Sequence, residues 1–232
     1  MKRILLALIA VFLFVGSTVS AQEDGFTRVV GNIGAMMNFT KAEDIDWSNN
    51  LSLSLGARIF PKYKNDNLNF GLSIFWDFNL INEMEWKSSD GTTYRITKDK
   101  TQNFLAFDIR VGASLQGPIS GIVNFVLDGG FLLNHFGASY DYGWGGLLYG
   151  DISLSYRIFD LGLYLNGGVQ VNLNKIVLEA GVDIGFSFFR KDSYAYYSKL
   201  QEKDISGYGD EGNFYGNFIF RPSPYILLGY MF

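Results

Sequence analysis

The sequence predicts an all-β fold: a transmembrane, antiparallel, up-and-down β-barrel. Three observations lead to this prediction. Apolar and polar residues alternate with a period of two along most of the chain after residue 22, the chain starts with a segment typical of secretion, and it stops on an apolar, aromatic run. Side chains of a strand alternate between two faces. A closed barrel is the arrangement in which such strands can cross a membrane.

The first segment has the layout of a cleaved secretory signal. Lys2 and Arg3 precede an unbroken apolar run at 4–15, and small and polar residues follow up to Ala21, which suits a cleavage site. The apolar run is shorter than the roughly 20 residues that a membrane-spanning helix needs. We therefore expect residues 1–21 to be removed and residues 22–232 to form one outer-membrane β-barrel domain.

Each strand-length segment of the remaining chain has one apolar and one polar face. Leu53 and Leu55, for example, alternate with Ser52 and Ser54. The segments are 29–39, 51–59, 68–80, 103–115, 123–133, 148–158, 161–173, 176–188, 214–220 and 225–232. Short and long connections tend to alternate between them, as short periplasmic turns and longer extracellular loops do in membrane barrels. A soluble, lipocalin-like barrel with the apolar face inside is the alternative.

The number of strands depends on the tail. Both termini of such a barrel lie in the periplasm, so the number must be even. If 221–224 is a hairpin, the tail adds two strands and the total is ten, which is our prediction; residues 190–212 then lie in the periplasm. If the tail is one strand, one earlier segment is not a full crossing, and the alternative is eight. Pro222 and Pro224 favour ten, because prolines interrupt a strand ladder.

Four large residues of the tail share one strand face: Ile226, Leu228, Tyr230 and Phe232. This pattern resembles the C-terminal assembly signal of bacterial outer-membrane barrels, which typically end in Phe. Residues 221–232 are similar to the ending of OmpW, where a Pro precedes an aromatic-rich run that closes with Gly-Tyr-x-Phe.

The chain thus resembles the small outer-membrane barrels of the OmpA-transmembrane, OmpX and OmpW kind. The resemblance implies a location in the bacterial outer membrane. It also implies two partners, outer-membrane lipid and the barrel-assembly machinery, the latter through the C-terminal strand.

Composition excludes several other classes. Removing Lys2 and Arg3 from the 19 basic side chains leaves 17 against 23 acidic ones, a net charge of −6. There is no dense basic patch, so nucleic acid is not expected as a partner. The chain has no Cys, which rules out disulfide scaffolds and thiolate metal sites. No cofactor and no metal site are expected.

Charged residues recur on the polar faces. We expect the following to point into the barrel: Arg28, Arg58, Asp77, Asp108, Arg110, Asp128, Asp151, Arg157, Glu179 and Asp183. Buried charges must be paired or hydrated, and small barrels fill their interiors with side chains. These residues predict an ion-pair network inside a narrow barrel. A hydrated, weakly cation-selective path is the alternative, because carboxylates outnumber guanidinium groups.

A passive barrel, either a narrow pore or a structural or surface-interaction protein, is the predicted function. The alternative is an adhesin that binds an extracellular ligand through aromatic loops. These loops contain Trp47, Trp86, Tyr94, Tyr140, Tyr142, Trp144, Tyr194, Tyr196 and Tyr197. An outer-membrane enzyme, a protease or a lipid A-modifying enzyme, is least favoured. The single histidine, His135, shares the parity of Leu133 and is expected to face lipid or the interface, so no catalytic residue is expected.

Overall fold

The computed structural model describes residues 27–42, 45–61, 68–80, 83–87, 93–97, 101–144, 151–198, 200–201, 203–209 and 213–232. The predicted signal at 1–21 lies outside these residues. The strands are β1 (Thr27–Ala42), β2 (Ile45–Pro61), β3 (Asn69–Leu80), β4 (Glu83–Lys87), β5 (Thr93–Thr97), β6 (Thr101–Ser120), β7 (Val123–Trp144), β8 (Asp151–Leu173), β9 (Ile176–Ser198), β10 (Lys203–Gly209) and β11 (Asn213–Met231). Among the described residues, no helix has the length and apolarity needed to cross a membrane.

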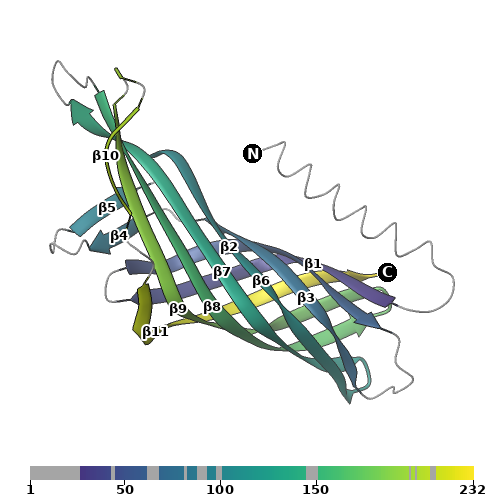
Figure 1. The fold of residues 1–232 in the computed structure, drawn as a ribbon. Helices are drawn as coiled ribbons and strands as arrows, with labels where there is room; N and C mark the ends of the chain where they lie inside the picture. Colours follow the sequence, from purple (N-terminus) through teal and green to yellow (C-terminus); the bar gives the residue numbers. More distant parts are fainter. Residues whose placement is uncertain are drawn as a thin grey trace.

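Eight of these strands close into an antiparallel barrel (Figure 1). They follow one another in the order β1, β2, β3, β6, β7, β8, β9 and β11, and β11 pairs with β1 to close the ring. The other three strands lie outside this ring: β4 and β5 form a hairpin beside β2, and β10 pairs with β9. The prediction of ten transmembrane strands is therefore wrong, and the alternative of eight is correct.

The described part of the predicted segment 148–158, from Asp151 on, and the predicted segment 161–173 form the single strand β8. The sequence suggests a turn at Phe159 and Asp160, because the apolar residues switch there from even to odd numbers. In the structure β8 continues through both, and Asp160 pairs with Asn134 on β7 and with Arg190 on β9. The switch of parity marks a change of surroundings along one strand.

The tail is also one strand, β11, in spite of its two prolines. The backbone amide of Phe232 donates to Val29 on β1, whereas that of Met231 donates to Lys175, in the turn that leads into β9. Successive backbone nitrogens of a strand point to opposite sides, so the nitrogens of Pro222 and Pro224, like that of Phe232, point toward β1. The pairing of β1 with β11 has already ended at Met36 and Tyr225. The missing N–H groups therefore face a side on which no ladder is formed, as on an edge strand.

The two ends of the barrel differ in the lengths of their connections. The two-residue turns at 121–122 and 174–175 lie at the end where β1 starts and β11 stops, and residues 62–68 join β2 to β3 there; at the opposite end, residues 43–44 join β1 to β2. Gly121 and Asn174 have positive φ angles of 53° and 60°, which glycine and asparagine tolerate best. Of residues 190–212, which the ten-strand prediction places in the periplasm, residues 199–212 connect β9 to β11 at the opposite end, where 81–100 and 145–150 also connect strands.

The barrel is apolar outside and polar inside. Leu72, Phe131 and Ile226 are 65%, 71% and 69% exposed on the outer face, whereas Ser52 and Asn134 are fully buried inside. A soluble barrel would have the reverse arrangement, since an apolar band of this extent is not stable in water. The lipocalin-like alternative is therefore wrong.

This arrangement inverts in the upper part of β7 and β8. Phe136 and Ile158 are fully buried on the inner face, whereas Arg157 and Asp151 are exposed on the outer face. The prediction that Arg157 and Asp151 point into the lumen is therefore wrong. Polar outer faces suit water better than lipid, so the membrane boundary crosses β8 near Leu161. Figure 1 shows β6 to β9 rising beyond the other barrel strands, with β10 alongside β9.

Candidate functional site: the interior polar network

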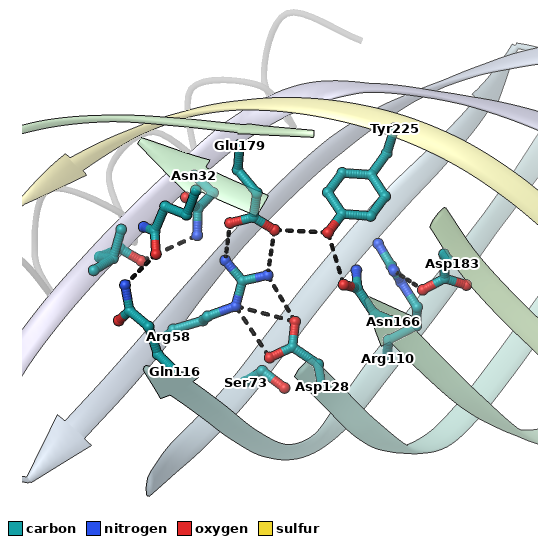
Figure 2. A network of polar contacts seen from close by, with 12 residues as sticks. Asn32, Arg58, Ser73, Arg110, Gln116, Asp128, Asn166, Glu179, Asp183 and Tyr225 are labelled. Atoms are coloured by element: carbon teal, nitrogen blue, oxygen red, sulfur yellow. Dashed lines mark hydrogen bonds and ion pairs between the residues drawn. The ribbon is translucent and has the colours of Figure 1, made fainter. Parts of the chain in front are cut away.

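Arg58 on β2 reaches across the lumen to two carboxylates. Its guanidinium donates to Asp128 on β7 at 2.6 Å and to Glu179 on β9 at 2.6 Å, and all three side chains are buried (Figure 2). Each carboxylate accepts more than one bond from the guanidinium, which is a strong and geometrically specific arrangement. Because β3 and β6 separate β2 from β7, and β1 and β11 separate β2 from β9, these bonds connect nearly opposite walls.

Arg110 on β6 forms a second connection across the lumen. It donates through two nitrogens to Asp77 on the neighbouring β3, at 2.7 and 2.9 Å, and it pairs with Asp183 on β9. The buried ring of Phe75 lies between the two arginines, with its centroid 5.0 Å from the guanidinium carbon of Arg58 and 4.9 Å from that of Arg110. Cation–π contact holds both guanidinium planes in place.

Tyr225 on β11 extends the Arg58 cluster. Its hydroxyl lies 2.8 Å from Glu179 and 2.7 Å from Asn166 on β8. The ring has room because Gly168 and Gly181 lack side chains: a Cβ at either position would come within 2.5 Å of the tyrosine oxygen. The two glycines pair with each other on β8 and β9, so they open a recess that the tyrosine fills.

Further polar contacts close the lumen above and below these clusters. Ser73 and Tyr164 meet across the lumen at 2.9 Å. At the end where β1 starts, Arg28 donates to Gln116, which in turn donates to Gln170. Toward the opposite end, one row of neighbouring residues holds two pairs: Asn134 with Asp108 at 2.5 Å, and Arg190 with Asp160 at 2.7 Å. The interior is therefore crossed by polar contacts at several heights.

The structure places most of the predicted interior charges in this network. The following are buried on the inner face: Arg58, Asp77, Asp108, Arg110, Asp128, Glu179 and Asp183. Arg28 is half-buried, and Arg157 and Asp151 lie outside the barrel wall.

Sequence reasoning missed Asp160 and Arg190 because it put them in connections. The signal that identifies Asp160 is its parity with Gly162, Tyr164 and Asn166 along one uninterrupted strand. Tyr225 was detectable too, since it alternates with the outward residues of the tail.

The interior network joins carboxylates to guanidinium, amide and hydroxyl groups. In the part of the chain that the structure describes, no group of acidic or histidine side chains could hold a metal ion. His135 lies on the outer face of β7 with its ring 5.2 Å from that of Phe107, away from the interior carboxylates. Two arginines share four carboxylates in the central clusters, so the clusters carry a formal excess of negative charge.

Comparison with known proteins shows the fold and little else. No family model and no curated protein matches the chain. A major outer membrane protein of Thermus thermophilus is similar, with 12% identity and a TM-score of 0.54 over 89% of this chain and 99% of that one. The translocator domain of the autotransporter NalP of Neisseria meningitidis and OmpF of Salmonella typhi align at 9% and 7% identity, over 98% and 91% of this chain and 97% and 99% of theirs. Their TM-scores are 0.17 and 0.15, too low for an argument.

The barrel is closed, its outer band is apolar, and its interior is polar and paired. Strands can cross a bilayer without unsatisfied backbone groups only when they form a closed ring, and the Thermus protein shares the fold. The chain is a small bacterial outer-membrane β-barrel protein.

Proposed function

We propose that the protein is a passive structural barrel with a lumen closed by ion pairs, which presents its extended outer part to the cell surroundings. The observation that carries this proposal is the pair of arginines, Arg58 and Arg110, that connect opposite walls through buried carboxylates. A passive barrel could instead be a narrow conducting pore. Conduction would require the ion pairs of Arg58 and Arg110 to separate.

The energetics favour the closed form. Separating Arg58 from Asp128 and Glu179 without a replacement partner leaves buried charges uncompensated, which costs about 3–5 kcal/mol in comparable cases. Small barrels of this strand number have interiors just wide enough for side chains. An ion that passed through would have to displace both clusters in turn.

Conductance in planar bilayers tests the proposal. We expect the wild-type barrel to show no steady conductance. The variant Arg58→Ala/Asp128→Ala/Glu179→Ala removes a whole cluster without leaving one charge behind, and it should admit water and small cations. Arg157→Ala, on the outer face, is the matched control and should behave like the wild type. If the wild-type barrel showed a steady conductance that no lumen variant abolished, the closed lumen would be ruled out.

A second candidate, binding of an extracellular ligand, has support from the upper strands. The backbones of all nine aromatic residues that the sequence assigns to loops belong to strands β2, β4, β5, β7 and β9; their side chains lie outside the described residues. A sheet that rises beyond the apolar band is a rigid base for such residues. Adhesion of cells that carry the protein to immobilised matrix proteins, compared with a deletion strain, tests this role.

The orientation of the barrel in the membrane can be measured because the chain has no native Cys. Short turns of outer-membrane barrels face the periplasm. We therefore expect Leu200→Cys to react with a membrane-impermeant thiol reagent on intact cells, and Lys175→Cys to react only after the outer membrane is permeabilised. The reverse result would contradict the proposed orientation.

The role of the tail in assembly stays a prediction. Ile226, Leu228, Tyr230 and Phe232 are exposed on the outer face of β11, and the rings of Tyr230 and Phe232 lie 5.0 Å apart. An exposed apolar face of this kind is available to assembly machinery before the strand meets lipid.

A further inference from the structure

Three basic residues lie together on the outer face of β7, β8 and β9, immediately above the apolar band. Leu133, Leu161 and Phe189 pair across these strands and form one of the last apolar rows. The next row contains His135 on β7 and Lys191 on β9, with Phe159 between them. Arg157 follows on β8, one outward position further along. This is the region in which Figure 1 shows β8 and β9 rising beyond the barrel.

The register brings the three side chains within reach of one another. Lys191 pairs with Phe159, and Arg157 pairs with Gly137 and Ser193. Arg157 is therefore the diagonal neighbour of both Lys191 and His135, and such neighbours have Cα atoms about 7–8 Å apart, a distance that long side chains span. Gly137 leaves a gap in the wall here. The Nε2 atom of His135 lies 3.5 Å from the place where a Cβ of Gly137 would be, so the imidazole occupies that gap beside Arg157.

Among the side chains that the structure describes, no carboxylate neutralises these charges. Arg157 and Lys191 are both exposed, and neither forms an ion pair with a described carboxylate. Their neighbours on the same face are Gly137, Ser193 and Phe159, none of them acidic. On β8 the first outward acid, Asp151, lies six residues beyond Arg157. The interior carboxylates point to the other side of the wall.

We propose that Arg157 and Lys191, with His135 beside them, bind the phosphate group of an outer-leaflet lipid head group. Two cations just above an apolar band match a molecule that carries a phosphate above acyl chains, and Phe159, Phe189 and Leu161 would contact the chains. Arginine forms paired hydrogen bonds with phosphate oxygens, and lysine adds a point charge. The inference does not depend on whether the lumen conducts.

Native mass spectrometry of the folded barrel in dodecyl maltoside tests this site. The probes are dioleoyl phosphatidylglycerol, the zwitterionic dioleoyl phosphatidylcholine, and inorganic phosphate as competitor. Each Lys or Arg near an anionic lipid surface contributes about fivefold in affinity. We expect Arg157→Gln/Lys191→Gln to weaken phosphatidylglycerol binding about 30-fold and to leave phosphatidylcholine binding unchanged. The single variant Arg157→Gln should weaken it about fivefold, and it serves if the double variant does not fold.

Lys175→Gln is the matched control, because Lys175 is exposed at the opposite end of the barrel. It should bind phosphatidylglycerol like the wild type. Unchanged binding by the double variant, or an equal loss in Lys175→Gln, would overturn the proposal. Complete displacement of the lipid by millimolar inorganic phosphate would show that the site recognises free phosphate, and this too would overturn it.

Discussion

Arg58→Ala is expected to lower the free energy of unfolding by about 3–5 kcal/mol. Removing the guanidinium leaves Asp128 and Glu179 buried without their cation, and both carboxylates are essentially inaccessible to water in the folded barrel. It also removes the contact with Phe75, whose ring rests between two arginines. Urea-induced unfolding in lipid vesicles, followed by tryptophan fluorescence, measures the change.

Two further variants separate lost pairing from lost volume. Arg58→Met/Asp128→Asn/Glu179→Gln keeps the side-chain volumes but removes all three charges, and it should recover most of the loss, since neutral replacements of buried ion pairs are often tolerated. Arg157→Ala, on the exposed face, should change the stability in phosphatidylcholine vesicles by less than about 0.5 kcal/mol. A loss below about 1 kcal/mol in Arg58→Ala would mean that water reaches the Arg58 cluster and hydrates its charges.

Leu165→Arg is expected to cost about 2–4 kcal/mol, the effect of an arginine near the bilayer midplane on the lipid face of a barrel. Leu165 is 54% exposed on the outer face of β8, well inside the apolar stretch that begins at Leu161. The same unfolding measurement in vesicles reports the loss.

Ser155→Arg places the same side chain on the same face of the same strand, ten residues away. If the membrane boundary crosses β8 near Leu161, Ser155 lies beyond it and the substitution should cost only about 0–1 kcal/mol. Equal losses in the two variants would mean that the apolar band extends past Arg157, and the boundary inferred from the inverted pattern would be wrong.

The inverted pattern also explains where sequence reasoning failed. Ile158 and Arg157 follow the usual alternation, so their local pattern resembles that of any other segment. Whether Ile158 or Arg157 points into the interior depends on whether the strand is surrounded by lipid or by water. An expectation of lipid along the whole chain assigns Arg157 to the lumen and a turn to Asp160. In the structure Asp160 continues the inner face and pairs with Arg190 on β9.

The tail is a second place where the local sequence does not predict the structure. Pro222 and Pro224 argue against a continuous strand when only β11 is considered. The prolines are tolerated because the pairing of β1 with β11 ends at Met36, and Met36 lies almost two hundred residues earlier in the chain.

By itself, the sequence determined the fold class, the membrane location and the face of each residue in the apolar band. These depend on an alternation of period two, which is a local property of the chain. Only the tertiary structure decided the number of strands, the height at which the outer face becomes polar, and the partners of Arg58 and Arg110. Strand pairing and register join residues that are distant in sequence. A charge that the sequence places inside the barrel therefore acquires its partner only when the ring has closed.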